Sequence, residues 1–314
     1  MDNAETTSSQ IMGDANVSTG LKSETTIISD VKALIKVGIV NSNLITAFTG
    51  FLLALHFTDA AFRENWQILL LTLSGTAFVI AGGCILNNWY DADIDPLMTR
   101  TKTRPTVTGT LSMQTILVLG LSSTAIGFLL LVFTTIEAAL IAMFGWFVYV
   151  ILYTMWTKRR YTLNTIVGSF SGAVPPLIGW AAIEPSIHIV PVALFLLMFV
   201  WQTPHFLALA MKKTEEYRYA GVPMLPVVYG FEFTKRQIVI YIACLLPLPF
   251  LLFSLGPIFL CVASLLNIGW LVIGLRGFLT KDDMGWANKI FVYSLNYLVI
   301  MFLTMAIVTI ELPF

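Results

Sequence analysis

The sequence is poor in charged residues. Only 11% of its 314 residues are Asp, Glu, Lys or Arg, and the 18 acids balance the 18 bases. Soluble domains carry roughly 25% charged residues, so this composition excludes an ordinary soluble domain. The formal net charge of zero argues against nucleic acid as a partner. With 57% hydrophobic residues and a mean hydropathy of +0.82, the chain is predicted to be an integral membrane protein.

Cysteine is also scarce. The three cysteines lie inside apolar runs and form no CxxC pair: Cys84, Cys244 and Cys261. This pattern is typical of small core residues rather than of a disulfide framework or a metal site.

A signal peptide is missing as well. Residues 1–30 are rich in Ser, Thr, Asn and acids, hold the single base Lys22, and contain no basic segment followed by an apolar core. We expect residues 1–30 to be a disordered cytoplasmic tail and residues 31–314 to form one transmembrane domain.

What the chain does have is a series of apolar segments long enough to cross a bilayer. They predict an all-α polytopic fold with nine transmembrane helices, at 33–55, 66–90, 112–133, 136–156, 164–183, 190–211, 237–255, 257–276 and 289–311. With the N-terminus inside, every Lys and Arg except Arg63 falls on one side, as the positive-inside rule requires. We therefore expect a cytoplasmic N-terminus and an external C-terminus, in a bacterial cell membrane.

The most informative stretch follows the second apolar segment and reads NNWYDADIDPLMTRTKTRPTVTGT, residues 87–110. If the helix continues past Asn87, a spacing of four places Asn87, Asp91 and Asp95 on one face. Asp93 points to the other side. Two carboxylates and an amide suit Mg²⁺, which takes one or two protein carboxylates and fills its other positions with water and phosphate oxygens. The alternative for this stretch is a solvated loop beyond a membrane helix.

Basic residues that suit phosphate oxygens stand near this motif. They are Arg100, Lys102 and Arg104 in the same loop, with Lys158 and Arg159 at the end of the fourth helix. Considered alone, Lys158 and Arg159 are more typical of a cytoplasmic anchor at the end of a membrane helix.

Other polar residues interrupt the apolar helices. Gln202 and His205 lie within the sixth helix, where an unpaired polar group is costly, so they indicate either a helix-packing hydrogen bond or a polar cavity. Asn41 and Asn43 form a polar insert in the first helix. Few ionisable groups lie at mid-membrane, which argues against a pump or an ion-coupled transporter. A cavity that opens to the cytoplasm, polar at its mouth and apolar below, suits an amphiphile with a charged head.

The aspartate motif carries a family resemblance. Asn87-x3-Asp91-x3-Asp95, followed by Arg104-Pro105, resembles the first aspartate motif of the UbiA superfamily of intramembrane prenyltransferases. Three blocks are similar to the heme-farnesylating members of that superfamily, at 87–109, 153–180 and 201–230. The likeness covers nearly everything from Lys32 onward.

This resemblance implies a ring of nine helices around a central cavity, so that 31–314 is a UbiA-type transmembrane prenyltransferase domain. It implies Mg²⁺ as cofactor, farnesyl diphosphate and heme B as substrates, and transfer of the farnesyl group to the 2-vinyl group of heme B with addition of water, giving heme O. The lipid bilayer and a heme A synthase that takes the product are the other partners. The implied catalytic residues are Asn87, Asp91, Asp95, Arg104, Tyr153 and Lys158, the first three as metal ligands. The implied substrate-binding residues are Asn41, Asn43, Arg100, Lys102, Arg159, His205, Lys212, Lys213 and Arg218.

The chain departs from the superfamily in one respect. Many members carry a second aspartate-rich motif after the sixth helix, but residues 205–218 contain no Asp. The resemblance therefore leaves a second Mg²⁺ in doubt, and Lys212, Lys213 and Arg218 are expected to replace its charge or to receive the heme propionates. His205 is expected to ligate the iron or orient the porphyrin. Two alternatives remain open: another UbiA-type prenyltransferase with an aromatic acceptor, and a transporter of heme or lipid without catalysis.

Overall fold

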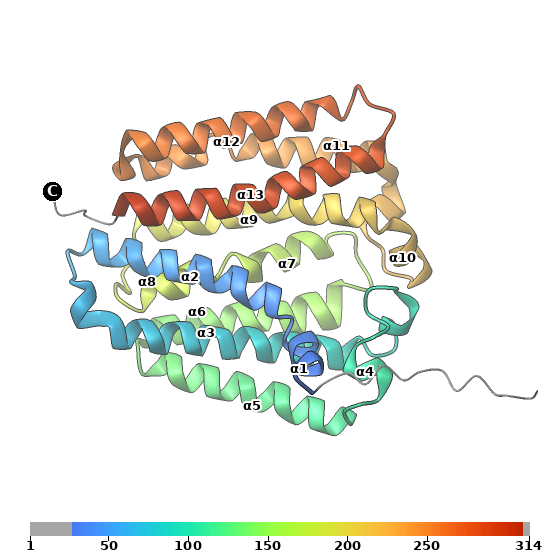
Figure 1. Cartoon of the computed structure of the whole chain (residues 1–314), viewed down its shortest axis with the longest axis horizontal. Helices are drawn as coiled ribbons and strands as arrows, with labels where there is room; N and C mark the ends of the chain where they lie inside the picture. The colour runs from blue at the N-terminus through green and yellow to red at the C-terminus, as the bar shows by residue number, and fades with distance from the viewer. Residues whose placement is uncertain (1–26, 310–314) are drawn as a thin grey trace, which may run out of the picture.

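The computed structural model describes residues 27–309, and every regular element in that range is a helix (Figure 1). The long elements are α2 (Val37–Phe57), α3 (Phe62–Tyr90), α5 (Met113–Val132), α6 (Ile136–Phe147) with its π-helical continuation η2 (Val148–Thr157), α9 (Ile189–Lys212), α11 (Leu225–Cys244), α12 (Gly256–Arg276) and α13 (Asp283–Thr309). The short elements are α1 (Ile27–Ile35), η1 (Asp95–Leu97), α4 (Pro105–Thr108), α7 (Asn164–Gly172), α8 (Pro175–Ala181), α10 (Thr214–Tyr219) and η3 (Leu248–Leu255). The predicted disordered tail, 1–30, lies outside the described residues, except that 27–30 belong to α1.

The chain is an integral, multi-pass membrane protein. In the described part of the chain, seven helical runs are long and apolar enough to cross a membrane. One of them, Leu225–Arg276, is 52 residues long. It includes α11 and α12, which pack side by side (Figure 1).

Two predicted helices are wrong in their bounds because of proline. Residues 164–183 do not form one helix: α7 ends at Gly172, and α8 starts at Pro175, which is followed by Pro176. Neither proline has an N–H to continue the ladder of α7. Residues 237–255 are likewise divided. The first part belongs to α11, which runs from Leu225 to Cys244, and the last part forms η3, which has two prolines near its start.

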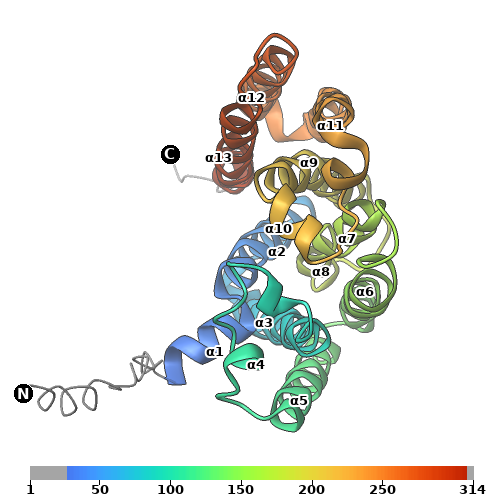
Figure 2. The ribbon, with the colours of Figure 1, turned by 90° about the vertical axis from the view of Figure 1, so that its right-hand side faces the viewer.

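The helices pack against one another in chain order, and the last helix packs against the first long one. Contacts run from α2 through α3, α5 and α6 to α7 and α8, then to α9, α11, α12 and α13, and α13 returns to α2. Seen from the end that carries α10, α5 lies outside α3, while α11, α12 and α13 form a group beside α9 (Figure 2). The helices α2, α3, α6, α7, α8 and α9 surround the centre, and α13 also contributes to the wall of the central cavity.

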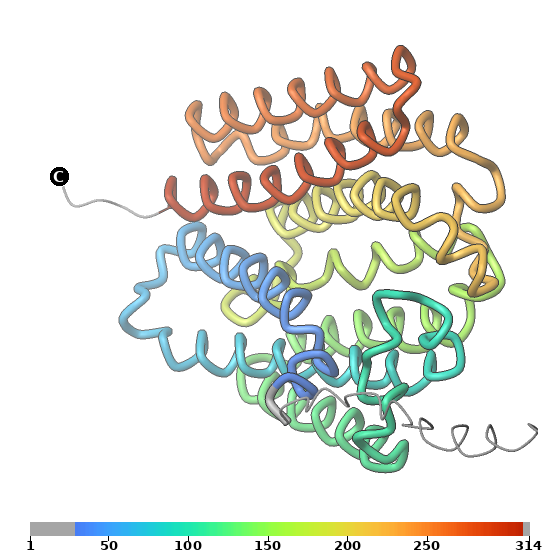
Figure 3. Tube along the Cα trace, turned by 45° about the vertical axis from the view of Figure 1, so that its right-hand side comes forward, coloured from blue at the N-terminus to red at the C-terminus, as the bar shows by residue number. Residues whose placement is uncertain are grey.

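Two loops cover one end of this bundle. The loop after α3 contains η1 and α4, and the loop after α9 contains α10. The two loops lie close together at this end (Figure 3). They meet through a small apolar cluster in which Ile94 and Met98 pack with Ala220 and Val222. This contact fixes the residues that follow α3 over the end of the bundle.

At the other end, α8 packs closely against α2. A Cβ at Gly50 of α2 would lie 2.1 Å from the carbonyl oxygen of Pro176, and one at Gly179 of α8 would lie 1.9 Å from that of Ala47. Real side chains do not approach backbone so closely, so glycine is required at both positions. Small residues at such crossings are typical of membrane helix packing.

We expect Gly50→Ala to destabilise the protein by about 1–3 kcal/mol or more, the usual cost of overpacking. The measurement is the thermal unfolding temperature in detergent. Gly38→Ala on the same helix is the matched control, because a Cβ there meets nothing within 4 Å. Equal unfolding temperatures for the two variants would contradict this account of the α2–α8 contact.

Candidate active site

A cavity of about 360 Å³ lies among the central helices. This volume falls within the range of small-molecule sites, roughly 300–1,000 Å³. Near the end covered by the two loops its wall is polar and includes Asn87, Asp95 and Lys158. Farther along the helices its lining is largely apolar and includes Val79, Ile80, Ala142, Trp146, Ile178 and Met198. The cavity therefore has one charged end and one apolar end.

The acids of the charged end follow directly from the end of α3. The helix ends at Tyr90, so it does not continue regularly to Asp95. The four-residue repeat nevertheless survives as a hydrogen-bonded turn: Asp91 N–H donates to Asn87 O at 3.0 Å, and Asp95 N–H donates to Asp91 O at 2.9 Å. Asn87, Asp91 and Asp95 are buried, at 2%, 0% and 0% exposed, whereas the Asp93 side chain is 63% exposed.

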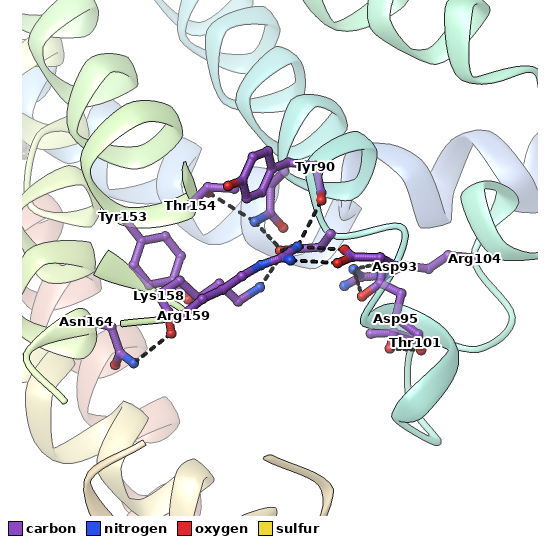
Figure 4. A network of polar contacts seen from close by, with 12 residues as sticks. Tyr90, Asp93, Asp95, Thr101, Arg104, Tyr153, Thr154, Lys158, Arg159 and Asn164 are labelled. Atoms are coloured by element: carbon purple, nitrogen blue, oxygen red, sulfur yellow. Dashed lines mark hydrogen bonds and ion pairs between the residues drawn. The ribbon is translucent and has the colours of Figure 1, made fainter. Parts of the chain in front are cut away.

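Each buried carboxylate is paired with a base. Arg104 Nη1 donates to both Asp95 oxygens, at 2.8 and 2.7 Å. Lys158 Nζ donates to Asp91 Oδ2, and Arg159 Nη2 lies 3.3 Å from Asp91 Oδ1. Figure 4 shows how these bases converge on the acids from η2 and from the loop after α3.

Arg159 also holds the outward-facing acid. Its two terminal nitrogens each donate to one oxygen of Asp93, at 2.7 Å, and its guanidinium lies 4.8 Å from the centre of the Tyr90 ring. These hydrogen bonds lower the pKa of the Asp93 carboxyl. Burial has the opposite effect on Asp95 and raises its pKa, although the Arg104 guanidinium opposes that rise. Asp95 is therefore a desolvated acid that depends on a nearby cation for its charge.

A π-helix leads directly to Lys158, one of the bases that pair with Asp91. In η2 the backbone bonds run from residue i to i+5, and the last of them is donated by Lys158 N–H to Tyr153 O at 2.9 Å. Such wide turns are rare and often occur at functional sites. Here η2 presents Tyr153 and Lys158 to the cavity and places Thr154 Oγ1 3.1 Å from Asn87 Nδ2.

The donor atoms of this end fit Mg²⁺. Asp91 and Asp95 offer carboxylate oxygens and Asn87 offers its amide Oδ1, and oxygen is the ligand type that Mg²⁺ prefers. Among residues 27–309, no group of three or more His, Cys, Asp or Glu gathers closely enough to hold a metal by itself. An ion here would therefore take further ligands from substrate phosphate, as Mg²⁺ commonly does.

The structure brings most of the predicted site residues to one cavity. Those that line it are Asn43, Asn87, Asp95, Arg100, Arg104, Tyr153, Lys158 and His205. Asp91 and Arg159 join them through the ion pairs described above. Asn41 and Lys102 are exposed and do not line the cavity.

The bases at the end of α9 and in the loop that follows do not line the cavity either. Lys213 pairs with Glu216 at 2.7 Å, and Arg218 pairs with Glu215. Lys212 donates to Asn288 Oδ1 at 2.7 Å and lies 4.7 Å from the centre of the Phe291 ring. They stand at the margin of the site, and their expected part in binding stays a prediction.

The sequence reasoning missed two features of the site. Lys36, counted there only as one more cytoplasmic base, donates from Nζ to Asn87 Oδ1. Tyr149 also lines the cavity and stacks on Tyr153, with ring centres 5.7 Å apart. The position of Lys36 near the start of the first apolar segment gives no local signal of this contact, since it joins residues 51 positions apart.

Comparison with known proteins shows extensive similarity. The pattern of the UbiA prenyltransferase family matches residues 43–296. The protoheme IX farnesyltransferase of Oceanobacillus iheyensis is 60% identical over 309 residues, which cover 98% of each chain. Protoheme IX farnesyltransferase 2 of Bacillus subtilis is 57% identical over 301 residues, covering 96% of this chain and 98% of that one.

Solved structures show the same fold at low sequence identity. A digeranylgeranylglyceryl phosphate synthase has a TM-score of 0.72 at 21% identity and covers 91% of this chain. The match includes 99% of that protein. A UbiA homolog from Archaeoglobus fulgidus, bound to DMAPP and Mg²⁺, has a TM-score of 0.64 at 17% identity, covering 89% of this chain and all of that one.

The helical membrane fold, with buried acids at the end of an apolar cavity, defines an enzyme of the intramembrane prenyltransferase class. The chain belongs to the UbiA prenyltransferase family, and its relatives place it in the protoheme IX farnesyltransferase branch of that family.

Asp91 and Asp93 allow a matched test of the metal site. We expect Asp91→Asn to weaken Mg²⁺-dependent binding of farnesyl diphosphate at least tenfold, since even outer-shell partners of metal ligands typically contribute about 10–100-fold. Asp93→Asn removes only a partly exposed ion pair and should change binding less than about fivefold. Titration calorimetry without an acceptor measures both. Comparable losses of affinity in the two variants would contradict a metal-binding role that belongs to Asp91 and not to Asp93.

Proposed function

We propose that this protein transfers a farnesyl group from farnesyl diphosphate to the 2-vinyl group of heme B, forming heme O. The observation that carries the proposal is the pair of buried acids, Asp91 and Asp95, neutralised by bases at one end of an apolar cavity. That arrangement suits a diphosphate head and a hydrocarbon tail. The names of the relatives that are 57–60% identical supply the particular donor and acceptor.

The proposal includes the membrane topology. If α11 and α12 each cross the bilayer, and α7 with α8 form one broken span, the chain has nine spans around the cavity. The N-terminus is then cytoplasmic, the C-terminus is external, and the charged end of the cavity opens to the cytoplasm of a bacterial cell. The clustering of the bases supports this orientation.

The charged end would bind and activate the leaving group. Asn87, Asp91 and Asp95 would hold Mg²⁺ against the diphosphate, and the ion supplies charge neutralisation as the allylic carbon–oxygen bond breaks. Arg104 and Lys158 line this end, and once Mg²⁺ neutralises the carboxylates they would bind the phosphate oxygens. Arg100 lines the same wall. Charges fixed in advance where negative charge develops are the main source of such rate enhancement.

The apolar part of the cavity would protect the farnesyl carbocation from water. The farnesyl tail would lie against the apolar wall, where water cannot quench the carbocation. Tyr153 and Trp201 line the cavity and offer electron-rich faces, each worth roughly 0.5–2 kcal/mol to a desolvated cation. The terminal vinyl carbon then bonds to farnesyl C1. Water adds its oxygen to the inner vinyl carbon and releases a proton, which leaves the hydroxyl group of the product.

The acceptor would lie on the α9 side of the cavity. His205 of α9 and Asn43 of α2 both line the cavity. Lys212, Lys213 and Arg218 stand at the margin, where they suit the propionates of a porphyrin. A heme A synthase is the expected recipient of the product.

Incubation of the purified protein with heme B, farnesyl diphosphate and Mg²⁺ tests this function by mass analysis of the extracted porphyrin. We expect a heme that has gained one farnesyl group and one hydroxyl group, and no product after EDTA treatment. Asp91→Asn should abolish turnover. Prenylation of 4-hydroxybenzoate in place of heme would show that the acceptor is wrong, and full activity of Asp91→Asn would exclude the catalytic role of the acid cluster.

A further inference from the structure

His205 is stacked face to face with two aromatic rings. It lies on α9 between Trp201, with ring centres 5.0 Å apart and planes 20° apart, and Phe291 of α13, at 4.8 Å and 26°. Lys212 lies over the same Phe291. The imidazole plane is therefore fixed by its neighbours, and only its edges are available for bonding.

One edge of this imidazole is occupied by Ser294 of α13. Ser294 is fully buried, and its Oγ lies 2.7 Å from His205 Nδ1. The same Oγ donates to the carbonyl oxygen of Phe291 at 2.5 Å. Two oxygens at that separation need a hydrogen between them, so the single hydroxyl proton of Ser294 is committed to Phe291.

The hydrogen bond from Ser294 to Phe291 determines which nitrogen of the imidazole carries the proton. Because Ser294 Oγ can only accept from His205, the neutral ring must carry its proton on Nδ1 and donate it. The other nitrogen, Nε2, then has a lone pair and no proton. The backbone of Ser294 is fixed too, because its carbonyl accepts a 3.0 Å hydrogen bond from Trp201 Nε1.

The free nitrogen belongs to a residue that lines the cavity. No hydrogen bond joins Nε2 to any group within residues 27–309. His205 forms part of the cavity wall together with Asn43 of α2 and Leu298 of α13. A neutral imidazole that donates from Nδ1 to a neighbouring oxygen and leaves Nε2 bare is the arrangement typical of histidines that bind metals.

We propose that His205 Nε2 is an axial ligand to the iron of the porphyrin substrate, and that Ser294 is a positioning residue that keeps this nitrogen unprotonated. The inference rests on heme as the acceptor in the function proposed above. Iron held at His205 places the porphyrin in the cavity that Asp95 and Lys158 line at its charged end.

The test compares heme B with metal-free protoporphyrin IX, which has the same shape and no iron. Both are titrated into the purified full-length protein without farnesyl diphosphate. We expect His205→Ala to weaken heme binding roughly a hundredfold, to remove the histidine-ligated Soret and EPR signature, and to leave protoporphyrin binding within a few-fold. Added imidazole should restore the signature. His205→Phe, which keeps a ring in the stack, serves if the alanine variant does not fold.

Ser294 is tested by the same titrations. Ser294→Ala should weaken heme binding about tenfold, the scale typical of an outer-shell partner, without affecting protoporphyrin, and Ser294→Thr should retain wild-type binding. Ser122→Ala is the matched control, since Ser122 is exposed on α5 and its Oγ likewise donates to the carbonyl three residues earlier.

Two outcomes would overturn the iron ligation. One is an unchanged heme spectrum and affinity in both His205 variants, and the other is an equal loss of both porphyrins. A wild-type protein that binds heme through His205 but makes no farnesylated heme would overturn the proposed function and leave the ligation standing. Farnesylated heme from wild type, with unchanged heme spectra in the variants, would do the reverse.

Discussion

The structure depends on the burial of two carboxylates at one end of an apolar cavity. An ionised acid removed from water is costly unless cations and hydrogen bonds replace its hydration. Asp91 and Asp95 meet this requirement through Lys158, Arg159 and Arg104. These partners come from two separate parts of the chain, so the cost of the buried acids also determines which elements must meet.

Several features of the fold serve that requirement. The π-helix η2 turns Lys158 toward Asp91, and the loop after α3 returns Arg104 to Asp95. The second loop, after α9, packs on the first and keeps it over the bundle. At the opposite end, the contact of α8 with α2 leaves no room for a side chain. Charge is thereby concentrated at one end of a cavity whose remaining wall is largely apolar.

Much of this organisation could be read from the sequence because it is local. The spacing of Asn87, Asp91 and Asp95 depends on about two consecutive turns of chain, and the apolar runs report most helices to within a few residues. The breaks at Pro175 and near Pro247 were missed because both lie inside apolar runs, where hydropathy alone does not show a change of helix. The π-helix has no sequence signal that distinguishes it from an α-helix of the same composition.

The contacts that could not be predicted join distant segments. Lys36 and Asn87 are 51 residues apart, and His205 and Ser294 are 89 apart. Polar residues in a membrane helix showed that Gln202 and His205 needed partners, but nothing in the sequence identified Ser294 as the partner of His205. Its role depends on the packing of α13 against α9, which only the folded chain provides.

The central claim is that the buried acids bind a divalent ion together with the diphosphate. Electron paramagnetic resonance of Mn²⁺, substituted for Mg²⁺ in the protein with a non-cleavable farnesyl thiodiphosphate, tests it most directly. The account predicts hyperfine coupling from ³¹P to the bound Mn²⁺, and its loss in the Asp91→Asn protein. A spectrum of fully hydrated Mn²⁺, with no ³¹P coupling in the wild-type protein, would contradict it.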